Sequence, residues 1–360
     1  MPVDSLEQLD KYCKRTLIRS TRQHERFGSL VAEAHRALAN PGIWDHEWAP
    51  PELDYGRAAE HPVHRAFTRE QKLAWSHLHW VMDYITVAQG EQQVVVLNGM
   101  AARRFATVCP SVCALQERES AEEADHVAAF FLVKDAVEAR YFPRDVPLRV
   151  DATSGTRSGR LNRGIRWLIG EGADRIFGSN FPTLFFMTRG MKSHAFKPFE
   201  IAYSRHEPSH PAIRALSELH GWDESRHIAS AQHLARLANP ILDAVPQENQ
   251  FLFRLAMERL WPRGRVVDYR ASYWRRCLAH ATVFASVPAE DREALADHIE
   301  RQLPRSLAAL HPLQETLVAK TNRRMVEESG LSPALKREFV GFLRADPTQA
   351  SVVSSVRIEA

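Results

Sequence analysis

Two copies of a Glu-x-x-His pattern stand far apart in this chain. They read Glu123-Ala-Asp-His126 and Glu224-Ser-Arg-His227, and His220 precedes the second copy by one helical turn. Because an α-helix repeats every ~3.6 residues, a Glu and a His three positions apart project from the same side and can hold one metal ion between them. The chain is therefore expected to contain at least two long helices whose ionisable faces meet.

Both motifs lie on stripes that are apolar at their ends and ionisable in the middle, which predicts that the middle is buried. The second stripe consists of Ile213, Leu216, His220, Glu224, His227, Ala231 and Leu234, and the first of Leu115, Glu119, Glu123, His126 and Phe130. A buried carboxylate between imidazoles is costly unless it is neutralised, and a divalent metal ion neutralises it. Both stripes therefore indicate a metal site.

Helical periodicity and turn residues predict an all-α fold throughout. Four long helices are expected over roughly 68–104, 111–138, 175–204 and 211–238, the first opened by the capping box Thr68-Arg-Glu-Gln71. In a ferritin-like four-helix bundle, two helices each supply a Glu and two each supply a Glu-x-x-His motif to a dinuclear centre. The chain is predicted to be such a bundle, with additional N- and C-terminal helices.

The remaining sequence suggests additions around this bundle. Residues 1–67 are expected to form a helix over Leu6–Leu38 and a wrapping strap, and residues 68–240 the bundle itself. Residues 241–346 are expected to pack on the bundle as further helices, and 347–360 to be a flexible tail. The helices expected in this C-terminal part lie near 247–261, 266–286, 288–302, 313–328 and 332–344.

The antiparallel pairing of the first two helices identifies a further ligand. If the turn between them lies near residues 107–110, Glu91 stands at the level of Glu123, and no other carboxylate lies between Asp83 and Glu117. Glu122 and Asp223 each precede a ligand Glu and are expected to hydrogen-bond the ligating histidines. Glu119 is expected to be a solvated helix residue rather than an auxiliary ligand.

Composition excludes several other classes of protein. The formal net charge of +3 over 360 residues does not imply nucleic-acid binding. The four cysteines are too few and too irregular for a disulfide framework or a zinc knuckle. The N-terminus lacks a secretory signal, and no apolar stretch approaches the ~20 residues that span a bilayer. A cytoplasmic protein without a membrane partner is expected.

The motifs resemble those of the arylamine N-oxygenases of the p-aminobenzoate N-oxygenase type. In this sequence, Glu91 is followed after thirty residues by Glu122-Glu123-Ala-Asp-His126, and the second half reads His220-Gly-Trp-Asp223-Glu224-Ser-Arg-His227. The resemblance covers roughly residues 68–238, and the extra histidine at position 220 is its most specific element.

The third helix departs from this family's pattern. The family places a Glu about thirty residues before its second motif, where this chain has no carboxylate. His194 occupies the matching level and is the expected ligand. Glu200 remains the alternative, although it lies ~9 Å further along a regular helix unless Pro198 distorts that helix.

The resemblance implies a non-haem di-iron enzyme that activates O₂ and oxidises an amine nitrogen of a small natural-product precursor. Its metal ligands would be Glu91, Glu123, His126, His194, His220, Glu224 and His227. The cofactor would be two iron ions, with a manganese–iron pair as an open alternative. The expected partners are a small-molecule substrate and an external electron donor, and a homodimer is left open.

Other functions remain open beside N-oxygenation. A di-iron hydroxylase, desaturase or oxidative decarboxylase would use the same ligands around a different pocket. A ferroxidase or storage protein is disfavoured by the long terminal additions. A non-catalytic helical binding protein would keep these His and Glu residues for structural reasons, and it would carry no stoichiometric iron.

Overall fold

The computed structural model describes residues 3–146, 148, 180–242 and 265–344, apart from the side chains of 3–4, 192–196, 265–269, 304–319 and 341–344. Within these ranges the chain is all-α, as predicted, and no strand is found there; the one β-type contact is an isolated bridge between Glu47 and Ser209. Among the described helices, none is both long enough and apolar enough to cross a membrane.

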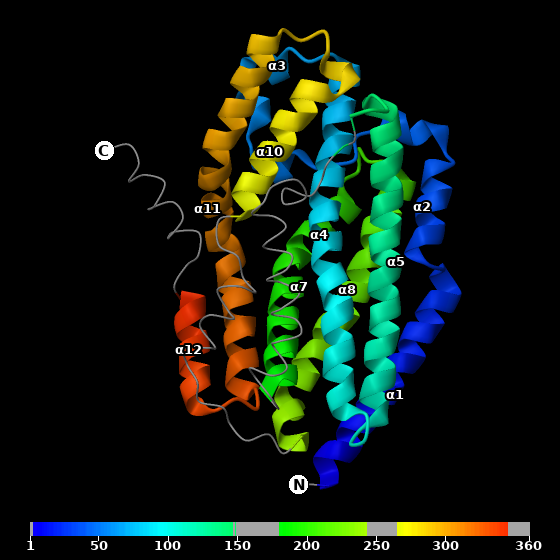
Figure 1. Cartoon of the computed structure of the whole chain (residues 1–360), viewed down its shortest axis with the longest axis vertical. Helices are drawn as coiled ribbons and strands as arrows, with labels where there is room; N and C mark the ends of the chain where they lie inside the picture. Colours follow the sequence, from blue (N-terminus) through cyan, green and yellow to red (C-terminus); the bar gives the residue numbers. More distant parts are fainter. Residues whose placement is uncertain (1–2, 147, 149–179, 243–264, 345–360) are drawn as a thin grey trace.

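Four long helices form the central bundle (Figure 1). They are α4 (Arg69–Phe105), α5 (Pro110–Tyr141), α7 (Phe181–Arg205) and α8 (Pro211–Ile241). Short connections after Phe105 and Arg205 make each successive pair antiparallel, and α4 packs mainly on α5 while α7 packs mainly on α8. Three of the four begin with proline in the first turn, where its missing N–H is no loss.

The predicted capping box opens the first of these helices. The Thr68 hydroxyl accepts from the Gln71 N–H at 3.2 Å, and the Gln71 side chain accepts from the Thr68 N–H at 2.9 Å. This reciprocal pair satisfies two N–H groups at the helix start, which fixes the register of α4 and hence the level of Glu91.

The N-terminal segment lies against the outer face of α5 and α8 (Figure 1). The sequence predicted one helix over Leu6–Leu38, but two form, α1 (Val3–Phe27) and α2 (Leu30–Leu38). Gly28 adopts φ +79°, which ends α1, and the Ser29 hydroxyl then caps α2 by accepting from the Ala32 N–H at 3.1 Å. The resulting bend lets both helices follow the bundle.

Short helices and the C-terminal helices complete the described chain. The strap contains η1 (Pro41–Asp45), η2 (Pro51–Leu53), η3 (Ala58–Glu60) and α3 (Pro62–Arg65). On the opposite side of the bundle from α1 lie α10 (Arg265–His280), η5 (Thr282–Phe284), α11 (Ala289–Glu328) and α12 (Pro333–Arg344) (Figure 1). The stacked rings of Trp75 and Trp274, 3.7 Å between centroids, join α4 to α10.

Some predicted boundaries were wrong. The helices expected at 288–302 and 313–328 are one continuous helix, α11, and α7 runs without interruption through Gly190 and Pro198. Proline removes one backbone hydrogen bond, but packing against neighbouring helices supports the rest of α7. The helix predicted at 247–261 and the start of the one predicted at 175–204 lie outside the described residues.

Candidate metal centre

The bundle interior brings two groups of metal-ligand side chains together. Glu91, His126, His220 and Glu224 form one group, and Glu123, Glu224 and His227 form the other. In each group, one ligand atom from every residue lies within 4.8 Å of those of the others. Glu224 belongs to both groups, so its carboxylate can bridge two ions.

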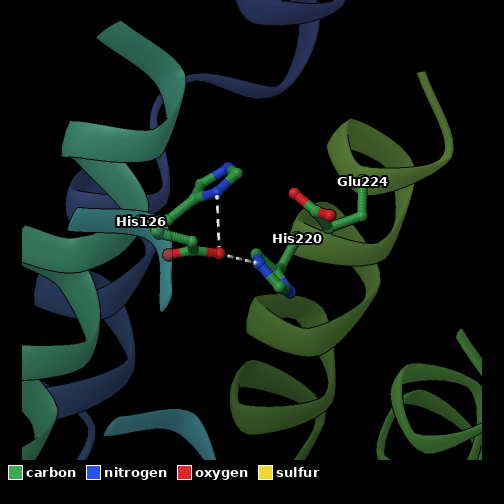
Figure 2. Close-up of side chains that lie close together, drawn as sticks. His126, His220 and Glu224 are labelled. Carbon is green, nitrogen blue, oxygen red and sulfur yellow. Dashed lines mark hydrogen bonds and ion pairs between the residues drawn. The ribbon is translucent and has the colours of Figure 1, made fainter. Parts of the chain in front are cut away.

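Facing helices supply these side chains. Figure 2 shows His126 on α5 directed towards His220 and Glu224 on α8. Glu91 reaches in from α4, with its Oε1 atom 2.8 Å from Nε2 of His220 and 3.6 Å from Nδ1 of His126. The height along the bundle that the sequence predicted for Glu91 is therefore also the height of the His126 and His220 imidazoles.

The second group is equally compact. Nδ1 of His227 lies 3.0 Å from Oε1 of Glu224 and 3.1 Å from Oε1 of Glu123. His227 and Glu123 are almost entirely buried. Histidine nitrogen and carboxylate oxygen at this spacing form a donor set that suits iron or manganese.

Buried polar atoms without hydrogen-bond partners show that this donor set fits a metal. Oε2 of Glu91, Oε2 of Glu123 and Nδ1 of His126 are all buried and make no hydrogen bond. Burying such atoms without a hydrogen bond is costly, and all three residues belong to the ligand groups that could hold an ion. Metal coordination would satisfy these atoms, so the residues fit a pair of metal ions.

The carboxylates behind the ligating histidines are crossed between helices. Asp223 on α8 lies 3.1 Å from Nε2 of His126 on α5, whereas Glu122 on α5 lies 2.9 Å from Nε2 of His227 on α8. The carboxylate that precedes the ligand Glu in each motif therefore hydrogen-bonds the ligating histidine of the other motif. Such partners fix the imidazole tautomer and ring orientation, leaving Nδ1 of both rings for the metal.

The third helix places a carboxylate behind His220 as well. Oε1 of Glu200 lies 2.8 Å from Nδ1 of His220, and Oε2 of Glu200 accepts from the Tyr84 hydroxyl at 3.1 Å. This geometry makes Glu200 a hydrogen-bond partner of a ligand. The backbone of His194 lies in α7, but its side chain is outside the described residues, so its assignment as a ligand stays a prediction.

Glu119 is not a solvated residue, and here the prediction was wrong. Its side chain is 1% exposed and pairs with Arg189 of α7 at 2.5 Å, while the other arm of Arg189 lies 2.6 Å from Oε1 of Glu123. No motif in the sequence identified Arg189. The available signal was one arginine inside the apolar run Phe181–Met191.

The first helix supports the outer carboxylates, which the sequence also did not reveal. Ser20 donates to Glu122, and Gln23 donates to Asp223 at 2.9 Å. Arg226 contacts both carboxylates, at 2.7 and 2.8 Å. A cavity of about 160 Å³ at the junction of α1 and α2 is lined by Ser20, Gln23, Phe27, Arg118, Glu122 and Asp223, among others. The outer carboxylates therefore border both the histidines and this cavity.

The carboxylates also change the protonation of the three histidines. Burial alone would lower the pKa of His220, but the charges of Glu200 and Glu91 overcome it and raise the pKa to about 10. The pKa values of His126 and His227 are raised well above their usual range, because hydrogen bonds and charges from the surrounding carboxylates outweigh burial. In the polypeptide alone, the surrounding carboxylates therefore favour the charged form of all three imidazoles.

Metal binding at pH 7 is therefore expected to release protons from the ligating histidines His126, His220 and His227. A ligating imidazole must be neutral, and the pKa of His220 is raised to about 10 while the pKa values of His126 and His227 are raised as well, so affinity should rise as the pH rises towards 10. Calorimetric titration of the metal-free chain with Fe(II) in two buffers of different ionisation enthalpy measures the release. Equal binding heats in both buffers would contradict the expectation.

Together, the fold and these groups define a class of protein. An antiparallel four-helix bundle, with a buried His and Glu cluster suited to two metal ions, is the arrangement of the ferritin-like dinuclear metal proteins.

Comparison with known families gives a more specific similarity. Residues 27–153, about a third of the chain, match the family described as acyl halogenase CylC-like. The matched range contains Glu91, Glu123 and His126 and ends before the second motif. Neither a curated protein nor a solved structure matches the chain. The matched family is one of enzymes, and the similarity does not single out the N-oxygenases.

Proposed function

We propose that this chain is a di-iron oxidative halogenase that replaces a C–H bond of an acyl substrate with a carbon–halogen bond. The observation that carries the proposal is the buried pair of ligand groups sharing Glu224, in a chain whose residues 27–153 are similar to an acyl halogenase family. A set of His and carboxylate donors without thiolate suits iron.

The reaction needs both O₂ and a reductant. One R–H, one halide ion, one O₂, two electrons and three protons give R–X and two water molecules. The C–H carbon is oxidised by two electrons, O₂ is reduced by four, and an external donor supplies the other two. Two iron ions held in the bundle would supply the capacity to activate O₂.

The chain's own residues have defined tasks in this proposal. Glu91, His126 and His220 would hold one ion, Glu123 and His227 the other, and Glu224 would bridge them. Asp223 and Glu122 keep the imidazoles of His126 and His227 oriented.

Apolar side chains shield the centre from water. The ring of Phe130, which is fully buried, lies 5.1 Å from that of His220 and 6.5 Å from that of His126. Excluding water protects reactive oxygen species from side reactions and strengthens electrostatic interactions within the site.

A halide-dependent product tests the proposal. Purified chain loaded with Fe(II) is supplied with O₂, a chemical reductant, bromide and a series of acyl thioesters and free fatty acids. The expected result is a product whose mass spectrum shows the bromine isotope pair, with none formed when bromide is omitted. Glu218→Ala, an exposed carboxylate on the same helix as Glu224, serves as the unaffected control. Oxygenated products that form equally without halide would contradict halogenation.

N-oxygenation is the second candidate, and a specific observation favours it. His220 stands one turn before Glu224 in a His-x-x-Asp-Glu-x-x-His pattern, which lies beyond the residues matched by the halogenase family. That reaction combines R–NH₂, O₂, two electrons and two protons into R–NHOH and water, and it consumes no halide. The same assay with arylamines, analysed for hydroxylamine products, distinguishes the two functions.

A further inference from the structure

Arg189 is a cation placed inside an apolar part of the bundle. Within Phe181–Met191 it is the only charged residue, and its neighbours Phe186, Met187 and Met191 are fully buried. The Arg189 side chain is itself only 3% exposed. A buried cation in such surroundings requires anionic partners and interacts strongly with them.

The two arms of this guanidinium have different surroundings. Nη1 is anchored by Oε2 of Glu119 at 2.5 Å and by Oδ1 of Asn98 at 3.1 Å. Gln116 in turn donates to Glu119 at 3.1 Å, so the anchor of Nη1 is a network of residues that belong to neither ligand group. Nη2 instead contacts Oε1 of Glu123, a member of the second ligand group, at 2.6 Å.

The second ligand group also has fewer protein donors than the first. Among the described side chains it contains three residues, whereas the first group contains four. Among the described side chains, an ion held by the second group would therefore have fewer protein donors than an ion held by the first. Glu123 belongs to this group and also contacts Nη2. Once it becomes a metal ligand, it would share its negative charge between the ion and Arg189.

We propose that Arg189 is the halide-binding residue of this site, holding a chloride or bromide ion beside the second metal position through its Nη2 arm. The inference rests on the proposed function and assigns its anionic co-substrate to a particular side chain. When Glu123 binds the metal ion, less of its negative charge remains to neutralise Arg189. A halide ion beside Nη2 would supply the missing negative charge.

The geometry favours a monatomic anion over a carboxylate. Arginine recognises a carboxylate best through two parallel hydrogen bonds, which need both arms of the guanidinium. Here Glu119 and Asn98 take both N–H groups of Nη1 and Glu123 takes one N–H group of Nη2, so Nη2 keeps one N–H group for a further partner. A halide ion needs only one such donor together with a metal ion, and it is small enough for a closely packed interior.

Anion binding can be measured without turnover. The chain is loaded with Co(II), and the visible absorption of the bound metal is followed during titration with bromide and, separately, with acetate. Two bound ions per chain are verified first. The wild type is expected to respond to bromide at lower concentration than to acetate.

Variants of Arg189 give the decisive comparison. Arg189→Gln is expected to weaken bromide binding about tenfold or more while both metal ions stay bound, because the charged donor is lost. Arg189→Lys is expected to weaken it as well, since one ammonium group cannot hold Glu119, Asn98 and a halide together. If Arg189→Gln fails to hold metal, Arg189→Lys provides the result. Arg270→Gln is the control, because it removes another buried arginine, which pairs with Asp83.

Unchanged bromide affinity in the metal-loaded variants would overturn the inference, and so would an equal dependence of acetate binding on Arg189. Failure of the proposed function gives a different result. If bromide binds through Arg189 but no acyl substrate is halogenated, the anion site stands and the reaction assignment fails. If halogenation occurs and Arg189→Gln binds bromide as well as the wild type, only the anion site fails.

Discussion

Replacing Glu224 with alanine is expected to leave the chain unable to hold either metal ion. Glu224 is the one residue shared by both ligand groups, so the substitution removes a donor from each. Loss of hydrogen-bond partners behind a ligand already lowers metal affinity by ~10–100-fold, and loss of a bridging ligand should exceed the upper end of that range. Halogenation or N-oxygenation should disappear with the metal.

Comparison with two other carboxylates makes this prediction specific. Glu91→Ala alters only the first group and is expected to leave one ion per chain, whereas Glu218→Ala on the exposed side of α8 should leave two. Metal content after dialysis against low Fe(II) is measured by elemental analysis, with circular dichroism to verify helicity. Two tightly held ions in folded Glu224→Ala would show that Glu224 does not bridge the centre.

Much of the bundle could be predicted because its determinants are local. Helical stripes, prolines at helix starts and the capping box at Thr68 are features of a few consecutive residues, and the structure confirms the helices that they predict. The level of Glu91 followed from one additional fact, the short connection between α4 and α5. When a turn is tight, counting residues away from it gives the pairing of two antiparallel helices.

The contacts of Arg189 could not be predicted in the same way. Its partners Glu119 and Glu123 lie on α5, and no spacing rule connects α7 to α5 across a long connection. Glu119 was misread as solvated because a charged residue in a helix is usually exposed, and only its distant arginine explains its burial. The support from Ser20 and Gln23 was missed for the same reason, since α1 is remote in sequence.

Local signals also failed where packing overrides them. Gly190 and Pro198 predicted interruptions, yet α7 continues through both. Because α7 is continuous, the position of Glu200 is the one that an uninterrupted helix gives it. The sequence estimate put Glu200 ~9 Å from the ligand level, and the structure places it behind His220 instead, as a partner of an imidazole that itself extends towards the centre.

The outer carboxylates provide the second large effect. Asp223→Asn and Glu122→Gln are each expected to lower the affinity for metal by ~10–100-fold, because each removes the anionic partner that orients a ligating histidine. The Asp223 substitution should act on the ion bound by His126, and the Glu122 substitution on the ion bound by His227. Stepwise titration with Co(II) separates the two binding events. Asp125→Asn is the control, because that carboxylate on α5 instead accepts from the Leu30 N–H at the start of α2.

The double variant should reveal that the two outer carboxylates are coupled in stability, because Arg226 contacts both. Either single substitution leaves Arg226 with one anionic partner, whereas the double substitution leaves a guanidinium that is only 10% exposed with none. The free energy of unfolding of the metal-free chain should therefore fall by more than the sum of the single effects, with a coupling of ~0.5–3 kcal/mol. Urea denaturation of the four proteins measures this coupling. Strict additivity would mean that Arg226 does not link the two crossed pairs, and each motif would then support its partner's histidine independently.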